Sequence, residues 1–214
     1  MYNHFQIHKY STIPIELSWV LQKAFFVRRF KNYIKKEKLL ILNHPITFTL
    51  GQKTNKAFIK DFFNWKHNNI HKIERGGEVT CHTPGQILVY IIMDLSQYQH
   101  DLHWYIYTIE NIIIQLLYNY DIQVYRIHGL PGVWFMNYKI ASVGVKVSKW
   151  ITLYGFSINL NINLGKFTEI IPCGIFNKEL SDLNTLLFPV SESQVKRELI
   201  QILKNFFKDR KGVI

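Results

Sequence analysis

A long apolar stripe between residues 101 and 120 limits the possible folds of this chain more than any other segment. Its members recur at the spacing of a helix that buries one broad face: Leu102, Tyr105, Ile106, Ile109, Ile112, Ile113, Leu116, Leu117 and Tyr120. Asp101 stands directly before the stripe and is a suitable N-cap. A helix of this kind must pack against other apolar elements, so we expect it to be part of a core and not a cofactor site.

Short apolar or alternating runs on both sides of this helix predict strands. Before it, strands are expected at residues 39–42, 46–50 and 87–93. After it, strands are expected at 122–127 and 132–135, then a tight turn at Asn137-Tyr138 and a hairpin of 139–148 with 150–160. Further helices are expected after Ser11, at 57–65 and after Ser191. Helices and strands do not alternate strictly, which predicts an α+β fold: a mostly antiparallel sheet flanked by helices, in a single domain of residues 1–214.

The chain is strongly basic, with a formal net charge of +11 at pH 7. Residues 28–38 hold six basic residues and one acidic residue, and residues 196–211 hold six and two. A solvated helix face is the simplest interpretation. If the charge has a function, its partner would be an acidic protein, an anionic membrane surface or a nucleic acid. No zinc-finger spacing, aromatic-rich RNA signature or helix-turn-helix pattern accompanies the charge, so we expect no nucleic-acid partner.

Targeting signals and cysteine usage bear on the compartment. No run reaches the roughly 18 apolar residues of a membrane span, and the first residues lack the pattern of a secretory signal. Cys81 and Cys173 make neither a disulfide framework nor a thiolate metal site. Frequent Ile, Asn, Lys, Tyr and Phe are typical of an AT-rich genome. We therefore expect a protein of a bacterial-type cytoplasm or a plastid stroma, neither secreted nor bound to a membrane.

Arg75-Gly76-Gly77 is the first candidate site, in a chain that lacks the common nucleotide, zinc and serine-hydrolase motifs. Two glycines let the backbone approach a ligand closely beside a fixed charge, although a bare Arg-Gly-Gly is more often a turn. After these glycines comes a polar run at 80–86, which stands directly before the predicted apolar strand at 87–93. A ligand can supply the partners that buried polar groups need there, whereas a histidine such as His82, taken alone, more often has a structural role.

Lys139 and Cys173 are the other candidates. Lys139 opens an apolar strand beside small residues, where partial desolvation would favour its neutral form and make it a possible base. A lysine that extends to solvent is the simpler alternative. Cys173 lies between Pro172 and Gly174, in a turn that a substrate can reach, and a nearby ammonium would favour its thiolate. An isolated cysteine is more often a small buried apolar residue, and Cys81 serves as an internal comparison.

Taken in order, these segments resemble the octanoyltransferases of lipoate biosynthesis, the lipoate-protein ligase B family. The resemblance covers residues from about 40 to 176, and each piece is weak while the ordered set is specific. The matching segments are His44-Pro45, Phe48-Thr49-Leu50-Gly51, Arg75-Gly76-Gly77, Val79-Thr80, His82, Pro84-Gly85-Gln86, Asp94-Leu95, Gly129-Leu130-Pro131-Gly132-Val133-Trp134, the run 139–147, Gly155-Phe156, Asn159 and Ile171-Pro172-Cys173-Gly174.

The resemblance implies a biotin/lipoate protein ligase-like catalytic domain and an acyl transfer in two steps. Cys173 would take an octanoyl group from octanoyl-acyl carrier protein as a thioester. The lysine of a lipoyl domain, in the 2-oxoacid dehydrogenase E2 subunits or the glycine-cleavage H protein, would then attack it. Lys139 would favour the thiolate and relay protons. The implied enzyme needs no cofactor and no metal, is a monomer, and its basic surface suits partners that are typically acidic.

The resemblance also implies an acyl-binding site. Its residues would be Arg75, Gly76, Gly77, Glu78, Val79, Thr80, Cys81, His82, Ser142, Val143, Gly144, Gly155, Phe156 and Ser157. Cys81 and Thr83 depart from the family, which usually has tyrosine and glycine there, so the shape of the pocket is in question. Two alternatives remain open: an ATP-dependent lipoate or biotin ligase on the same fold, and a non-catalytic protein-binding relative.

Overall fold

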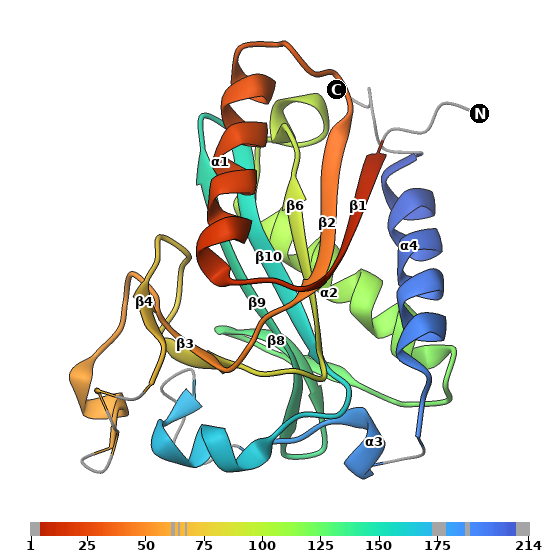
Figure 1. The fold of residues 1–214 in the computed structure, drawn as a ribbon. Coiled ribbons are helices and arrows are strands. Elements are labelled where there is room, and N and C mark those ends of the chain that lie inside the picture. Colours follow the sequence, from red (N-terminus) through yellow and green to blue (C-terminus); the bar gives the residue numbers. More distant parts are fainter. Residues whose placement is uncertain are drawn as a thin grey trace.

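A large sheet with helices on both faces forms the centre of the molecule (Figure 1). The computed structural model describes residues 5–60, 63, 65–66, 68–172, 179–186 and 189–208. Within these residues the large sheet has eight strands, in the order β1-β2-β6-β10-β9-β8-β7, with β11 beside β9. They are β1 (Phe5–Thr12), β2 (Glu37–Asn43), β6 (Gln86–Ile92), β7 (Tyr125–Ile127), β8 (Leu130–Phe135), β9 (Tyr138–Ser148), β10 (Ile151–Asn159) and β11 (Glu179–Leu180).

Most neighbouring strands of the large sheet are antiparallel, as the sequence predicted. The exceptions among the described strands are β1 with β2 and β11 with β9, which are parallel. The longest ladder joins β9 to β10 through the turn Lys149-Trp150, where both residues have positive φ. Such a two-residue turn matches the twist of the strands it joins. The predicted α+β class, with a mostly antiparallel sheet flanked by helices, is confirmed.

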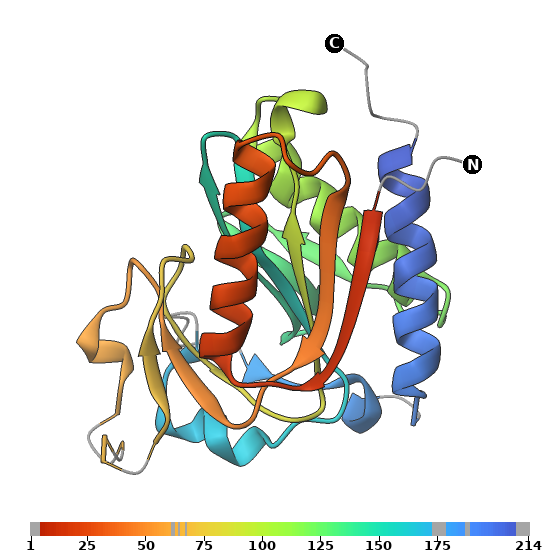
Figure 2. The same ribbon diagram turned by 45° about the horizontal axis from the view of Figure 1, so that its top comes forward.

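A second, small sheet lies beside the first turn of α1 (Figures 1 and 2). Its described strands are β3 (Thr47–Leu50), β4 (Ile70–Lys72) and β5 (Val79–His82), in the order β4-β3-β5. The described part of the connection from β3 to β4 contains a 3-10 turn, η1 (Lys56–Phe58), which Asn55 caps. Ile59 then forms a β-bridge with Ile170, so the described residues of the predicted helix at 57–65 are helical at 57 and 58 alone, as the end of this 3-10 turn. Phe58 and Ile59 are aromatic and β-branched, and residues of these kinds favour extended backbone over a helix.

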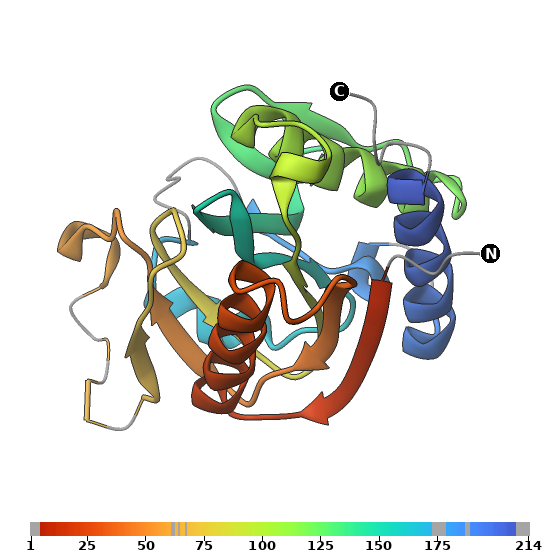
Figure 3. The same cartoon turned by 90° about the horizontal axis from the view of Figure 1, so that it is seen from above.

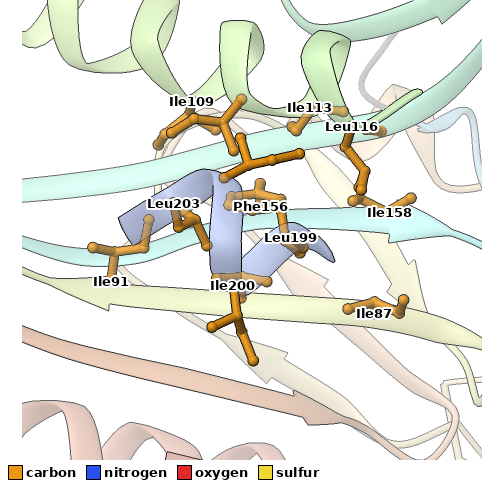
Figure 4. Packing of buried hydrophobic residues seen from close by; sticks show 14 of the residues in the cluster. Ile87, Ile91, Ile109, Ile113, Leu116, Phe156, Ile158, Leu199, Ile200 and Leu203 are labelled. Atoms are coloured by element: carbon orange, nitrogen blue, oxygen red, sulfur yellow. The ribbon is translucent and has the colours of Figure 1, made fainter. Parts of the chain in front are cut away.

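The main core lies between the large sheet and two helices, α2 (Leu102–Tyr118) and α4 (Glu192–Lys208). Figure 4 shows Ile109, Ile113 and Leu116 of α2 facing Phe156 and Ile158 of β10, with Leu199 and Leu203 of α4 beside them. Each such side chain stabilises the fold by roughly 1.5–3 kcal/mol on burial. Asp101 caps α2 as predicted and accepts hydrogen bonds from the N–H groups of His103 and Trp104. Most of the predicted stripe is therefore core, but Leu102 is 39% exposed, and Leu102 and Ile106 line a cavity.

α1 (Ile15–Phe30) covers the other face of the large sheet. Seen from above, the sheet separates it from α2 (Figure 3). The helix predicted after Ser11 begins at Ile15: Ser11 and Thr12 belong to β1, and Pro14 takes the N-cap position without a side-chain hydrogen bond. The helix buries Ile15, Ser18, Gln22 and Arg29. Several of its apolar residues point to solvent instead. None of the described helices is both long and apolar enough to cross a membrane.

Several short elements differ from the sequence-based predictions. The turn between β8 and β9 is Met136-Asn137, one residue before the predicted turn, and Met136 has positive φ. β1, β4 and β5 were not predicted, and β7 is shorter than the predicted strand at 122–127. The remaining described elements are η2 (Leu95–Gln97), η3 (Leu164–Glu169) and α3 (Leu183–Leu186).

Candidate active site

A cavity of about 450 Å³ opens between the small sheet and the β9–β10 hairpin, within the size range of small-molecule sites. Residues from both sheets, from α2 and from three loops line it: Lys53, Ile73, Arg75, Gly76, Gly77, Glu78, Thr80, His82, Leu88, Tyr90, Leu102, Ile106, Gly129, Leu130, Pro131, Lys139, Ser142, Val143, Gly144, Val145, Tyr154, Gly155, Phe156 and Ser157. Apolar side chains predominate, and the polar groups come mainly from segments that the sequence singled out.

One wall of the cavity carries almost no side chains. Gly144 of β9 pairs directly with Gly155 of β10, and Ser142 pairs with Ser157 two residues along. Because residues two apart share a face of a strand, these four residues leave a shallow strip on the sheet. A Cβ atom on Gly144 would lie 3.1 Å from the Cδ of Arg75, so this glycine makes room for the arginine.

Arg75 is held in place by the small sheet. Its Nη2 donates to the carbonyl oxygen of Thr49 at 3.0 Å and to Thr49 Oγ1 at 2.9 Å, while Nη1 donates to the carbonyl oxygen of Gly76 at 3.0 Å. The N–H of Gly76 donates to the carbonyl oxygen of Val145 at 3.0 Å, which fastens this loop to β9. A planar cation fixed by several hydrogen bonds gives the cavity a permanent positive group.

His82 is buried at the cavity wall and is neutral. Its Nδ1 lies 3.2 Å from Gln86 Oε1, an oxygen that can only accept, so Nδ1 carries the proton and Nε2 is the acceptor. Burial, with contributions from His44 and Arg75, lowers the pKa of His82 to about 3. Asn159 orients Gln86 in turn, because the Gln86 side-chain amide donates a hydrogen bond to Asn159 Oδ1 at 2.9 Å. A chain of oriented amides therefore fixes the tautomer of His82.

Two tyrosines close one end of the cavity. The Tyr90 hydroxyl donates to His44 Nε2 at 2.9 Å, and His44 Nδ1 donates to the carbonyl oxygen of Ile13 at 2.7 Å. Burial lowers the pKa of His44, which keeps it neutral as an acceptor. Tyr154 has φ of 61°, an unfavourable conformation for a bulky residue, and its N–H donates to Gln22 Oε1 at 2.7 Å. Backbone strain of this kind commonly marks functional sites.

Lys139, only 5% exposed, opens β9 at the cavity wall. Its Nζ lies 5.3 Å from the ring centroid of Trp134, within the range of a cation–π contact. Gly132 has φ of +135°, and a Cβ atom there would lie 2.6 Å from Lys139 Cε. The glycine therefore leaves the space that the lysine side chain occupies. The alternative in which Lys139 extends to solvent does not occur.

The structure brings together most of the predicted site residues. Those that line the cavity are Lys139, Arg75, Gly76, Gly77, Glu78, Thr80, His82, Ser142, Val143, Gly144, Gly155, Phe156 and Ser157. Val79 and Cys81 do not line it, because β5 turns them to its opposite face, into a separate apolar cluster. Burial raises the pKa of the Cys81 thiol to about 12, so the thiolate is not populated at neutral pH.

Cys173 lies outside the described residues. The chain before it is described up to Pro172, where the N–H of Ile171 donates to the carbonyl oxygen of Phe58 at 2.7 Å. The next described residues after Pro172 form β11, where Leu180 pairs with Lys139. Cys173 is therefore seven positions from a residue that is paired with the buried lysine.

Several lining residues were missed by the sequence reasoning. Leu88 and Tyr90 lie on a strand that was predicted, but nothing in its uniform apolar run shows which residues face the cavity. Leu102 and Ile106 belong to the predicted core stripe of α2. The loop at 129–131 was part of the family resemblance without being assigned to the site. Among the residues described here, no cluster of three or more His, Cys, Asp or Glu could hold a metal ion.

The sequence of the chain matches a known catalytic domain over most of its length. The family described as lipoyl protein ligase A/B catalytic domain matches residues 14–204. The chain belongs to this family. An octanoyltransferase of Nostoc sp. strain PCC 7120 is 35% identical over 205 residues, covering 96% of this chain and 93% of the relative. An octanoyltransferase of Prochlorococcus marinus strain MIT 9312 is 40% identical over 164 residues, covering 77% and 76%. The predicted resemblance to octanoyltransferases is confirmed, and with it the assignment as an acyltransferase.

Solved structures of lipoyl protein ligases and biotin protein ligases share the fold. A bipartite lipoate protein ligase from Thermoplasma acidophilum superposes with a TM-score of 0.76 at 13% identity, covering 95% of this chain and 83% of that chain. A biotin protein ligase from Aquifex aeolicus gives a TM-score of 0.53 at 13% identity, covering 98% and 70%. At this identity the likeness concerns the fold alone. It agrees with the predicted ligase-like catalytic domain.

Proposed function

We propose that this lipoyl protein ligase A/B family member transfers an octanoyl group from octanoyl-acyl carrier protein to the lipoyl-lysine of lipoyl domains. The acceptors would be the E2 subunits of 2-oxoacid dehydrogenases and the glycine-cleavage H protein. The observation that carries the proposal is the buried Lys139 on the wall of a largely apolar cavity, in a chain whose relatives are octanoyltransferases. The proposed enzyme is one domain and a monomer of a bacterial-type cytoplasm or plastid stroma.

The first step would load the enzyme. The thiolate of Cys173 attacks the octanoyl thioester carbonyl, the bond from that carbon to the carrier sulfur breaks, and the carrier leaves as a thiol. Lys139 would take the proton of the Cys173 thiol and return it to the departing carrier sulfur. Exchange of one thioester for another is nearly isoenergetic, so this step needs no nucleotide.

The second step would discharge the acyl group onto an amine. The neutral ε-amine of the lipoyl-lysine attacks the Cys173 thioester, an amide forms, and the sulfur leaves as the thiolate. The proton that the attacking amine loses would pass through Lys139 to solvent. Amides are more stable than thioesters, which makes the second step favourable.

The cavity is well suited to the acyl chain. Ile73, Leu88, Tyr90 and Tyr154 offer an apolar end, while the Gly144–Gly155 strip lets a chain lie against the sheet. The oriented groups of Arg75 and His82 lie on the opposite wall, where the neutral imidazole adds no charge. Such a site would hold the chain by apolar burial.

An ATP-dependent ligase is the main alternative, since ligases share this fold. A ligase activates the free acid as an adenylate and needs no cysteine, so the role of Cys173 separates the two activities. Purified protein incubated with octanoyl-acyl carrier protein and no ATP should gain the mass of one octanoyl group. Cys173→Ala should abolish this gain, and Cys81→Ala, the matched control, should retain it.

Two results would overturn the proposal. One is full transfer to a lipoyl domain by the Cys173→Ala variant, and the other is transfer that requires ATP. An intact protein that neither gains the octanoyl mass nor transfers it would instead support a non-catalytic, protein-binding relative.

A further inference from the structure

The outer face of α1 is apolar along its length. Leu17, Val20 and Val27 are 47%, 56% and 46% exposed, and Ala24 completes the stripe between them. Their spacing of three and four residues places them on one side of the helix, opposite the buried Ser18 and Gln22. A surface helix normally turns such a stripe toward the core and presents charged residues to water.

Large apolar side chains extend this stripe on α1 and beyond its end. Trp19 and Phe30 flank it and are 43% and 54% exposed, and Tyr33 follows in the turn after the helix at 73%. Single exposed apolar residues are ordinary on protein surfaces, but a contiguous set usually marks a binding surface. We call residues 17, 19, 20, 24, 27, 30 and 33 the α1 surface.

The charge around the end of the α1 surface is mostly positive, and the acids beside it are Glu16 in the first turn and Glu74, which pairs with Lys23. Between Leu17 and Lys36 the sequence contains no aspartate or glutamate. Arg28, Lys31, Lys35 and Lys36 are exposed at the end of the helix and in the turn that follows. A partner that covers the apolar stripe therefore also meets a group of cations, and an acidic surface complements them.

The helix that carries the α1 surface contacts the cavity wall with its opposite, buried face. Gln22 accepts the N–H of the cavity residue Tyr154, and Lys23 pairs with Glu74 at 2.6 Å. Lys146 of β9 pairs with the same Glu74 carboxylate at 2.9 Å. Glu74 directly precedes the cavity residue Arg75 in the chain. Figure 2 shows α1 standing along the sheet with the small sheet, which bears one cavity wall, beside its first turn.

We propose that the α1 surface is the docking site of the acidic acyl carrier protein that loads the enzyme, an inference that rests on the proposed function. A carrier helix with an apolar stripe can pack against the apolar stripe of the α1 surface. Acidic residues beside the carrier's stripe would then meet the cations at the end of α1. A carrier holds its acyl group on a long flexible arm, so it can dock beside the cavity. An acceptor must insert its own lysine side chain and has to sit over the opening.

The test compares loading by a protein donor with loading by a small donor. The variants are Val20→Glu with Val27→Glu, which adds acid to the stripe, and Arg28→Glu with Lys31→Glu, which reverses the cations. The control is Arg197→Glu, one charge reversal of the same kind at an exposed position on α4, across the sheet. The readout is single-turnover octanoyl loading of the enzyme, followed by intact mass.

With octanoyl-acyl carrier protein, both double variants should load at least about tenfold more slowly at subsaturating donor, while the control stays within about twofold of the parent. With octanoyl-pantetheine, all proteins should load at the parental rate. The parental rate with the carrier should also fall as salt is raised, because screening weakens electrostatic attraction.

Each other pattern rejects the proposal in a recognisable way. Equal loss with both donors would show that α1 acts on the cavity and not in docking. Normal loading with slow discharge to a lipoyl domain would assign the surface to the acceptor. Unchanged carrier kinetics would also reject it. In that case, loss of binding to phosphatidylserine vesicles in the variants would indicate a membrane surface, and loss of a dimer in sedimentation would indicate a second copy. A parent protein that loads from neither donor would contradict the proposed function itself.

Discussion

Two buried histidines, His44 and His82, make the stability of this protein depend on pH. Both are neutral in the fold, and burial lowers the pKa of His82 to about 3. The unfolded chain takes up both protons as the pH falls through about 6.5, whereas the lowered pKa values delay their uptake by the fold to lower pH, which is near 3 for His82. The free energy of unfolding should therefore be highest above that pH and decrease below it, by up to about 1.4 kcal/mol per pH unit for each histidine.

Urea unfolding between about pH 7 and pH 4.5 would measure this dependence. His82→Gln should unfold at lower urea at neutral pH, yet lose less stability on acidification than the parent. His103→Gln makes the same change at an exposed histidine of α2 and should keep the parental slope. A His82→Gln variant with the parental slope would show that protonation of His82 does not destabilise the fold.

The predictable part of the site consists of residues whose chemistry is unusual for their surroundings. Arg75 and Lys139 were singled out because a charge stood beside glycines or at the start of an apolar strand, and both line the cavity. Val79 and Cys81 were assigned to the site and lie on the other face of β5. Strand β5 was not predicted, so the alternation that separates its two faces was not visible in the sequence.

A buried acid on α2 positions Lys139 through Gly132 of β8. Glu110 Oε1 accepts the N–H of Gly132 at 2.8 Å, and its other oxygen lies 3.0 Å from Arg126 Nε. The guanidinium of Arg126 stacks over Tyr107 at 4.1 Å. Because Gly132 leaves the space for the Lys139 side chain, Glu110 acts on the lysine through this glycine.

Removal of the Glu110 carboxylate should therefore disturb catalysis more than binding. Under the proposed function, Glu110→Ala should lower kcat by about tenfold, which is about 1.4 kcal/mol of barrier, with a smaller change in KM. Glu110→Gln keeps an acceptor for Gly132 and should restore most of kcat. Steady-state octanoyl transfer by the two variants provides the test, and equal kcat values for Ala and the parent would rule out the positioning role.

Elements with strong periodicity could be predicted, and short elements could not. α1, α2 and the β9–β10 hairpin carry regular apolar patterns and were found in the expected places. β1 is an edge strand with a mixed pattern and gains its structure from pairing with β2, which a local pattern does not reveal. The apolar residues of α1 predicted the helix correctly but not its inner face, because Ser18, Gln22 and Arg29 find buried polar partners.

At the scale of the whole molecule, α1 is fastened to the sheet by a buried ion cluster. Arg29 Nη2 lies 3.1 Å from Asp94 Oδ2, and its Nε lies 3.5 Å from Glu37 Oε2. Glu37 Oε2 also accepts the N–H of Asp94 at 3.3 Å. The cluster joins the last turn of α1 to the start of β2 and the end of β6. The same helix supports Tyr154 at the cavity, so the cluster connects the stability of the fold with the shape of the site.

Loss of Arg29 should therefore destabilise the whole fold. In Arg29→Met the Glu37 carboxylate keeps its burial and loses its cation, which typically reduces the free energy of unfolding by about 3–5 kcal/mol. Arg29→Met combined with Glu37→Gln removes both charges and should recover part of that loss. Arg28→Met changes the exposed neighbour and should stay within about 0.5 kcal/mol of the parent. Denaturant unfolding of the three variants measures these differences. If Arg29→Met were no less stable than Arg28→Met, the cluster would not hold α1 on the sheet.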